Sequence, residues 1–194
     1  MTAAVVIPLK GFAAAKGRLA EVLDPPEREA LARRLASGVI SAAPGRVIVV
    51  TSDAAAARLA TDLGASIVDD PGGGLNLAAD AGRQHAIVTG ADRVAVVHAD
   101  LPFPATLAEV LASEGIVLIP DRRGDGTNVI VLPGESDDFT FSYGPGSFAR
   151  HLTEAHRVSD RIHVIGDSPL GWDIDIPEDL DTPAEWGNWA ACRS

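Results

Sequence analysis

The chain has 194 residues, of which 46% are hydrophobic and 22% charged, and its formal net charge is −11 at pH 7. This length and composition are typical of a globular protein with a substantial core, and we expect a single domain over residues 1–194. The acidic charge argues against general binding to nucleic acid or to an anionic membrane, because both need a basic face.

No stretch approaches the roughly 20 apolar residues that a membrane span requires, and the first apolar run, Ala3–Leu9, is too short for the core of a secretory signal. The single cysteine, Cys192, cannot form an internal disulfide, which suits a reducing compartment. We therefore predict a cytoplasmic protein.

Over the first 120 residues, short β-branched runs alternate with stretches of helical spacing. The runs predict buried strands at Ala3–Leu9, Arg46–Thr51, Ser66–Val68, Arg93–His98 and Ile116–Ile119. The stretches predict helices at Glu27–Ala43, Ala54–Leu63, Leu75–Val88 and Thr106–Ala112. This alternation predicts a three-layer αβα sandwich, an α/β fold with a mainly parallel mixed sheet, whose ligand crevice lies outside the carboxyl ends of the strands.

After Pro120 the regular alternation of predicted strands and helices ends. The pattern predicts a helix at Phe148–His156 after a glycine-rich corner, and strands at Thr127–Leu132, Asp138–Ser142, Arg161–Ile165 and Trp172–Ile176. An acidic helix or set of turns follows. Trp186 and Trp189 in the tail pack either on the body of the protein or on a partner subunit.

A basic loop follows the first predicted strand. The chain has only two lysines, Lys10 and Lys16, and both lie in this loop with Arg18, while no acidic residue occurs before Glu21. Lysine is a common phosphate ligand, so a local cluster of cations on an acidic protein indicates an anion-binding loop. A solvated surface loop is the alternative.

Three aspartates are candidates for a metal site. Asp100 follows an apolar run and therefore stands at the tip of a predicted strand, facing the crevice. Asp173 and Asp175 alternate with isoleucines, which places both on one face of an extended segment. Neighbouring carboxylates repel unless a divalent cation or a basic group lies between them. Because Mg²⁺ favours a few carboxylates plus substrate phosphates, the three predict a Mg²⁺ site.

A second anion site is expected at the glycine-rich corner. Ser147 follows Gly144-Pro145-Gly146 and is predicted to cap the next helix, whose first amides would bind an anion. Thr127 from a neighbouring strand could complete a pocket for a phosphate or carboxylate. An ordinary capped turn is the alternative.

Other common motifs are absent from the sequence. There is no Walker loop, no H-E-x-x-H, no C-x-x-C and no serine nucleophile elbow, and Gly72–Asn76 lacks the third glycine of a dinucleotide fingerprint. His151 and His156 are five residues apart and so lie on different helix faces. The chemistry must therefore rest on carboxylates, cations and backbone amides.

The chain resembles the CofC/FbiD guanylyltransferases of deazaflavin coenzyme biosynthesis, from residue 5 to about residue 181. The motifs that carry the resemblance are, in order, Lys10-x5-Lys16-x-Arg18-Leu19, Gly74-Leu75-Asn76-x-Ala78, Ala99-Asp100-Leu101-Pro102, Pro120-Asp121-Arg122, Gly126-Thr127-Asn128, Tyr143-Gly-x-Gly-Ser-Phe148 and Asp173-Ile-Asp175-Ile-Pro177. The resemblance implies a single nucleotidyltransferase domain with a nucleotide-diphospho-sugar transferase-like fold. It also implies an enzyme of coenzyme F-420 biosynthesis that joins GTP to phosphoenolpyruvate or 2-phospho-L-lactate and releases pyrophosphate.

The resemblance further implies a role for each site residue. The triphosphate would be held by the basic loop and the base or ribose bordered by the glycine turn, that is, Lys10, Lys16 and Arg18 with Gly74 and Asn76. Mg²⁺ would be held by Asp100, Asp173 and Asp175, and the acceptor's phosphate and carboxylate by Thr127, Gly144 and Ser147. Catalysis would fall to Lys10, Lys16, Arg18 and Asp100.

This sequence departs from the family pattern at two positions. Gly17 stands where the basic loop is expected to carry serine or threonine, and His98 stands where a D-x-D pair would need an aspartate. The metal must then draw on Asp173 and Asp175.

Two alternatives stay open. One is a nucleotidyltransferase with another acceptor, namely 3-phosphoglycerate, a molybdopterin or a sugar phosphate, and the other is a non-catalytic nucleotide-binding protein. The arginine-rich composition favours phosphoenolpyruvate among the acceptors. The resemblance also suggests the downstream deazaflavin transferase as a partner, while the oligomeric state is left open.

Overall fold

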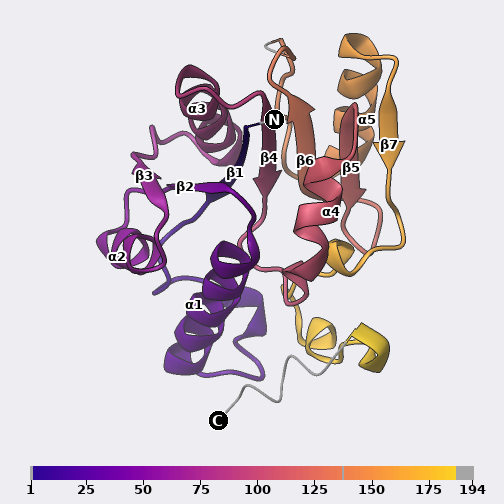
Figure 1. Cartoon of the computed structure of the whole chain (residues 1–194). Coiled ribbons are helices and arrows are strands. Elements are labelled where there is room, and N and C mark those ends of the chain that lie inside the picture. Colours follow the sequence, from indigo (N-terminus) through magenta and orange to yellow (C-terminus); the bar gives the residue numbers. More distant parts are fainter. Residues whose placement is uncertain (1, 137, 187–194) are drawn as a thin grey trace.

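The computed structural model describes residues 2–136 and 138–186 and is built around a seven-stranded sheet in the order β3-β2-β1-β4-β6-β5-β7 (Figure 1). The strands are β1 Ala3–Pro8, β2 Arg46–Val50, β3 Ser66–Val68, β4 Arg93–Val97, β5 Ile116–Pro120, β6 Thr127–Pro133 and β7 Ile162–Val164. Strand β6 runs antiparallel to β4 and β5, and the other neighbouring pairs are parallel. The predicted mainly parallel mixed sheet is confirmed.

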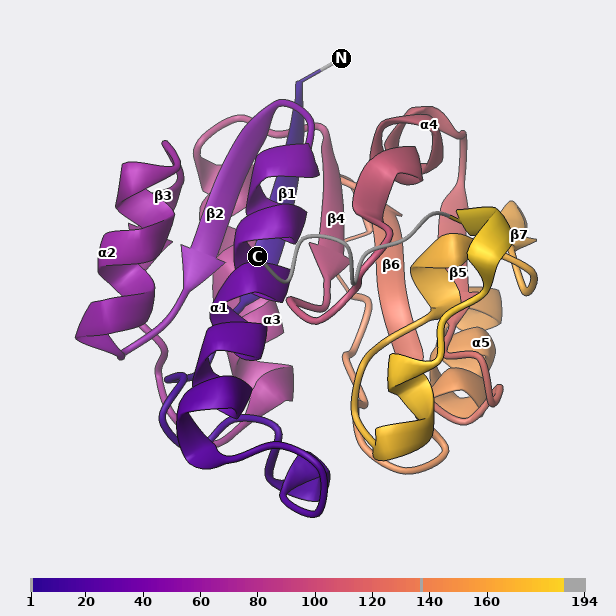
Figure 2. The same cartoon turned by 90° about the horizontal axis from the view of Figure 1, so that it is seen from below.

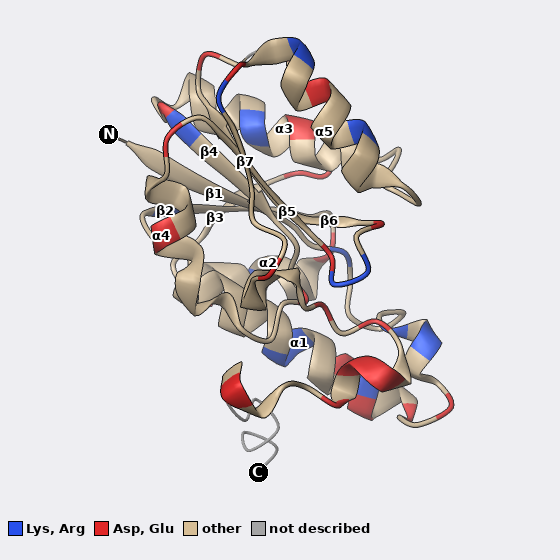
Figure 3. Ribbon diagram, turned by 90° about the vertical axis from the view of Figure 1, so that its right-hand side faces the viewer, with Lys and Arg blue, Asp and Glu red and all other residues tan. Residues whose placement is uncertain are grey.

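Helices cover both faces of the sheet. They are α1 Pro25–Ala42, α2 Ala54–Asp62, α3 Leu75–Val88, α4 Leu107–Ala112 and α5 Ser147–Val158. Seen along the sheet, α3 and α5 lie on one side and α1, α2 and α4 on the other (Figure 3). Figure 2 shows α1 and α2 beside β1 to β3, and α4 and α5 beside β5 to β7. The predicted three-layer sandwich is confirmed.

The central strands β1, β4, β5 and β6 are buried on both faces, which explains why their sequences read as continuous apolar runs. In β1, Val5 and Ile7 pack against the helices of one face, while Ala4 and Val6 pack against those of the other. All of these side chains are completely buried. The sheet is therefore a rigid platform from which its edge loops project.

The start of α1 follows from local sequence, and the helix begins two residues before the predicted Glu27. The Asp24 carboxylate accepts a hydrogen bond from the Glu27 amide, and the Glu27 side chain accepts one from the Asp24 amide. Two prolines occupy the first helical positions, where no amide is needed.

Two predicted strands are wrong. Residues 138–142 and 172–176 pair with no strand in the described part of the chain. The amides of Thr140 and Ser142 donate to the side chains of Glu154 and His151 on α5. The first alternating pattern therefore reflects packing of Phe139 against a helix and not against a sheet.

The structure describes only one of the two tail tryptophans, Trp186 and Trp189. Trp186 packs edge-on against Phe103 and Trp172, so it contacts the body of the protein. Trp189 and Cys192 lie outside the described residues. Within the described residues, no helix has the length and apolar character needed to cross a bilayer.

Candidate functional site

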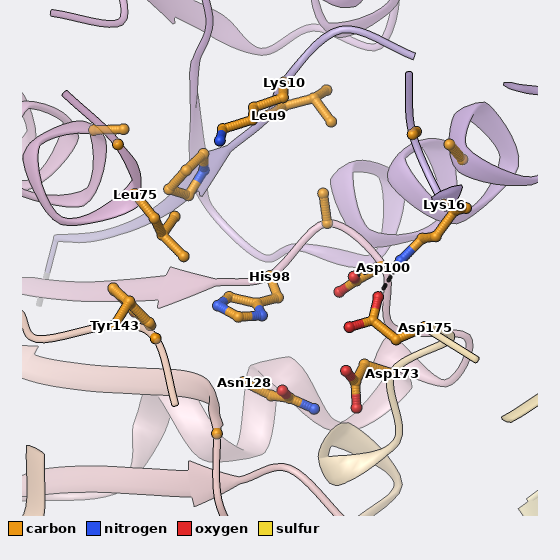
Figure 4. Close-up of a pocket in the computed structure, with 18 of the residues that line it drawn as sticks. Leu9, Lys10, Lys16, Leu75, His98, Asp100, Asn128, Tyr143, Asp173 and Asp175 are labelled. Carbon is orange, nitrogen blue, oxygen red and sulfur yellow. Dashed lines mark hydrogen bonds and ion pairs between the residues drawn. The ribbon is translucent and has the colours of Figure 1, made fainter. Parts of the chain in front are cut away.

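A cavity of about 620 Å³ opens at the carboxyl ends of β1 and β4, where the fold predicts a ligand crevice. Its walls also include the first turns of α3 and α5 and the loop between β5 and β6. The predicted site residues that line it are Lys10, Lys16, Arg18, Gly74, Asp100, Thr127, Gly144, Ser147, Asp173 and Asp175. Segments far apart in the chain are thus brought together in one site (Figure 4).

Lys16 lies between two of the three aspartates. Its Nζ is 2.7 Å from Asp100 Oδ2 and 3.0 Å from Asp175 Oδ1, and its side chain is only 8% exposed. Burial alone would lower the pKa of Lys16, but the two carboxylates raise it above its ordinary value. A basic group, and not only a metal, therefore offsets the repulsion between these carboxylates.

A small apolar cluster fixes this arrangement. Leu19 and Ile174 are completely buried and pack with Leu31 and Leu35 of α1. Leu19 lies three residues after Lys16, and Ile174 lies between Asp173 and Asp175 in the sequence. The cluster therefore holds the lysine and the aspartates in register with each other.

The three aspartates lie close enough together to hold a metal ion. One oxygen each of Asp100, Asp173 and Asp175 lies within 4.8 Å of the others. Asp100 Oδ1 and Asp173 Oδ1 are buried, and neither has a hydrogen-bond partner among the described residues. Burial, and then repulsion by Asp100 and Asp175, raises the pKa of Asp173 to about 7. Unpaired hard oxygen donors at this spacing fit a divalent cation.

Asp179 holds the segment that carries Asp173 and Asp175. Its Oδ2 accepts hydrogen bonds from the amides of Asp175 and Ile176, both at 2.8 Å. Its Oδ1 accepts from Arg122 and Arg123, which belong to the turn between β5 and β6. This completely buried carboxylate joins the two segments that form one side of the site.

The predicted acceptor residues also meet. Thr127 begins β6 and Ser147 begins α5, and their hydroxyl oxygens lie 3.4 Å apart, both almost completely buried. The prediction that Ser147 caps α5 is wrong, because the cap position is Gly146 in a left-handed conformation with φ 69°. Ser147 is the first helical residue, and it lines the cavity without capping its own helix.

The glycine turn before α3 needs its glycines. Gly72, Gly73 and Gly74 all have positive φ, a conformation that side chains disfavour. Gly74 lines the cavity, whereas Asn76 is not among its lining residues. The Asn76 side chain instead accepts a hydrogen bond from the Tyr143 amide at 2.6 Å, tying α3 to the loop before α5.

The other two cations are more open. Lys10 is exposed at the mouth of the cavity. Arg18 is 77% exposed and lies 3.9 Å from Asp175. Both can therefore move towards an incoming anion without first leaving a buried ion pair.

Sequence reasoning missed several cavity residues. His98 Nε2 and the Tyr143 hydroxyl are buried, and both lack a hydrogen-bond partner within the described residues. His98 lies between Asp100 and Tyr143 in Figure 4. The sequence signal for His98 was its position two residues before Asp100. No sequence signal pointed to Asp179, because its two arginine partners lie in another loop.

Comparison with known proteins identifies relatives along nearly the whole chain. Residues 3–188 match the family model described as "Guanylyl transferase CofC like". The chain is 40% identical to a phosphoenolpyruvate guanylyltransferase of Rubrobacter xylanophilus, over 93% of this chain and 92% of that protein. It is 36% identical to the protein of the same name in Sphaerobacter thermophilus, over 93% and 92%.

Solved structures share the fold at low sequence identity. A structure assigned as a nucleotide-diphospho-sugar transferase from Desulfovibrio desulfuricans has a TM-score of 0.78 at 17% identity, covering 99% of this chain and 94% of that one. A glucosyl-3-phosphoglycerate synthase from Mycobacterium tuberculosis, in complex with Mg²⁺ and uridine diphosphate, has a TM-score of 0.54 at 16% identity, covering 85% and 69%. The nucleotide-diphospho-sugar transferase-like fold is thereby confirmed.

The family match and the relatives agree with the resemblance carried by the basic loop, the three aspartates and the glycine-rich corner. The chain is a nucleotidyltransferase and belongs to the CofC-like guanylyltransferase family.

Proposed function

We propose that the chain transfers the guanylyl group of GTP to the phosphate of phosphoenolpyruvate and releases pyrophosphate, as a step in deazaflavin coenzyme biosynthesis. The observation that carries this proposal is a single cavity that joins a cation and carboxylate cluster to a second, hydroxyl-lined pocket. Relatives named phosphoenolpyruvate guanylyltransferase support the choice of substrates.

In this reaction an oxygen of the acceptor's phosphate attacks the α-phosphorus of GTP. The new phosphorus–oxygen bond forms as the bond to the bridging oxygen of pyrophosphate breaks. A phosphate monoester is largely doubly ionised near pH 7, since its second pKa is about 6. It needs no general base, which explains how a site without a serine–histidine pair can perform the transfer.

The chief obstacle is repulsion between two anions. In the proposed reaction Lys10 and Arg18 would bind the triphosphate and the leaving pyrophosphate, and Lys16 would neutralise charge beside Asp100, which it contacts. Asp100, Asp173 and Asp175 would hold Mg²⁺. When bound, Mg²⁺ supplies charge neutralisation at the reacting phosphates.

We assign the acceptor to the opposite side of the cavity. The hydroxyls of Thr127 and Ser147 and the backbone around Gly144 can donate to a small phosphorylated carboxylate. Gly74 and the start of α3 border the nucleoside. A compact, buried hydroxyl pair favours a three-carbon acid over a bulky pterin or sugar phosphate.

The proposed function also implies a setting. A guanosine diphospho-linked enol acid would be labile, so direct transfer to the downstream deazaflavin transferase in the cytoplasm is expected. A pull-down of the two proteins tests this contact, and failure to recover the transferase at any salt concentration would count against it.

The first experiment measures pyrophosphate release from GTP and Mg²⁺ with phosphoenolpyruvate, 2-phospho-L-lactate, 3-phosphoglycerate or no acceptor. We expect release with phosphoenolpyruvate and little without an acceptor. Release with a different acceptor alone would replace the substrate, and release with none of them would overturn the acceptor assignment.

A further inference from the structure

His151 of α5 is completely buried beside the hydroxyl pair, at a position that sequence analysis considered only as a metal ligand and excluded. Its ring packs edge-on against Tyr143, with centroids 4.8 Å apart, and stacks with Phe139. Both ring nitrogens have hydrogen-bond partners, and these partners determine which nitrogen carries the proton.

The Ser142 amide lies 2.8 Å from His151 Nε2. A backbone N–H can only donate, so Nε2 must be the unprotonated acceptor. Burial, and then the positive charge of Arg150, lowers the pKa of His151 to about 4, so the ring is neutral near pH 7. In a neutral ring with unprotonated Nε2, the proton is on Nδ1.

Nδ1 lies 3.0 Å from Thr127 Oγ1 and therefore donates to it. The Thr127 hydroxyl has a single hydrogen, which cannot point back at the ring. That hydrogen must point towards Ser147 Oγ or towards a ligand in the cavity. With the opposite tautomer, the hydroxyl would donate to the ring and turn its lone pairs towards the cavity.

We propose that His151 is a positioning residue that fixes the Thr127 hydroxyl as a hydrogen-bond donor to the anionic acceptor. The inference rests on the proposed function, because Thr127 is assigned to the acceptor there. The chain of bonds runs from the Ser142 amide through the ring to Thr127, and it presents a donor to a ligand that can only accept. It also selects against a ligand that would offer a donor at this point.

Two substitutions separate this role from a purely structural one. His151→Gln places an amide oxygen near Nε2, so it can keep the bond from Ser142 but loses the bond to Thr127. His151→Asn places an amide nitrogen near Nδ1, so it can keep the bond to Thr127 but loses the bond from Ser142. His151→Ala loses both.

The KM for the acceptor and the KM for GTP are measured in each variant. We expect His151→Ala and His151→Gln to raise the acceptor KM by about 10-fold, as loss of one hydrogen bond to a charged group does, with the GTP KM little changed. His151→Asn should restore most of the lost acceptor affinity. In a Thr127→Val background, His151→Gln should have no further effect. His156→Gln, at an exposed histidine of the same helix, is the matched control.

The tautomer is measured independently by ¹⁵N NMR of the histidine rings, and we expect His151 to be protonated at Nδ1 only. A ring protonated at Nε2 would overturn the inference, as would an acceptor KM that His151→Gln leaves unchanged or that His151→Asn raises equally. Wild-type protein with no acceptor-dependent pyrophosphate release would instead overturn the proposed function, and these two failures are distinct.

Discussion

Lys16 is the residue at which the basic and acidic parts of the site meet. Its backbone is left-handed, with φ 56°, and it is the only non-glycine residue with positive φ among those described. Such a conformation costs roughly 1–2 kcal/mol for a residue with a side chain. It persists because it directs the ammonium group between Asp100 and Asp175, where attraction offsets the backbone cost.

We predict that Lys16→Ala reduces kcat/KM for GTP by about 100-fold or more, because a positioned charge next to the reacting phosphates is lost. The free energy of unfolding without divalent cations should fall by about 1–3 kcal/mol, discounted for partial exposure of the two aspartates. Steady-state kinetics and chemical denaturation measure both effects. Lys10→Ala is the control, since this exposed lysine should affect kinetics without affecting stability. An unchanged kcat/KM in Lys16→Ala would remove the lysine from catalysis.

Asp173→Asn should separate function from stability. The Asp173 carboxylate is buried, has an unpaired oxygen and is repelled by Asp100 and Asp175, so an amide there relieves an unfavourable interaction. We expect the metal-free free energy of unfolding to rise by about 1 kcal/mol. Turnover, and the increase in Tm that Mg²⁺ causes in the wild type, should both be lost. A variant that is still stabilised by Mg²⁺ to the wild-type extent would exclude Asp173 as a ligand.

At the scale of elements, α3 lies unusually close to the sheet at Gly82. A Cβ added there would lie 2.3 Å from a Val6 methyl group and 2.7 Å from one of Val50. In α1, by contrast, a Cβ added at Gly38 would have nothing within 4 Å. The close approach of the sheet therefore requires glycine at position 82, whereas no neighbouring atom requires it at position 38.

We predict opposite signs for alanine at these glycines. Gly38→Ala should stabilise the protein by about 0.5–1 kcal/mol through helix propensity. Gly82→Ala gains the same propensity, but overpacking against β1 and β2 typically costs about 1–3 kcal/mol, so net destabilisation is expected. Chemical denaturation of both variants gives the comparison. Equal stabilisation by the two substitutions would show that α3 can move away from the sheet at little cost.

The hydrogen bonds of Asp179 are a second contact between segments of the fold, and they support the site although Asp179 does not line the cavity. Asp179→Ala would leave Arg122 and Arg123 without their carboxylate and free the amides of Asp175 and Ile176. Loss of a buried partner of this kind typically costs about 3–5 kcal/mol, and we expect destabilisation of that size. Residual folded protein should need more Mg²⁺ for half-maximal activity, because Asp175 loses its support. Full activity at the wild-type Mg²⁺ concentration would show that the segment is held by its apolar contacts alone.

At the scale of the whole molecule, sequence periodicity was sufficient for the sheet and the helices but not for two extended segments. A central strand such as β4 is apolar throughout because both faces are buried. Residues 138–142 alternate just as a strand with one exposed face does, yet the amides of Thr140 and Ser142 donate to side chains of α5. Periodicity reports which side chains are buried, and it cannot report whether the backbone partner is a strand or a helix side chain.

The residues of the candidate site also differ in how far the sequence could predict them. Lys16, Asp100, Asp173 and Asp175 could be selected from sequence, because their charges stand out against apolar or arginine-rich surroundings. His151 and Asp179 could not, because their roles depend on partners such as Thr127 and Arg122 that lie 24 and 57 residues away. Candidate ligand-binding residues are therefore more visible in sequence than the residues that would position them.

The net charge of −11 opposes the arrival of two anionic substrates at a locally basic cavity. The repulsion by the whole molecule acts over a longer distance than the attraction by the basic cavity. Salt therefore changes their balance, since the Debye length shortens from about 30 Å at 0.01 M salt to about 8 Å at 0.15 M. At low salt an approaching anion senses the whole acidic molecule, whereas at moderate salt it senses mainly the nearby Lys10 and Arg18. The sign of the salt effect should therefore be opposite to that of a nucleic-acid-binding protein.

We predict that kcat/KM for the acceptor rises as KCl is raised from about 0.01 M to about 0.15 M at constant free Mg²⁺, and falls only at higher salt, where the local cations are screened too. Asp62→Asn and Asp160→Asn, at exposed positions outside the cavity lining, should together weaken the initial rise. Lys10→Ala should leave the rise intact and weaken the later fall, because only Arg18 of the two exposed cations then remains to be screened. A steady decrease from the lowest salt concentration onwards would mean that the basic loop dominates the field even at long range, because only a net attraction can be weakened by screening.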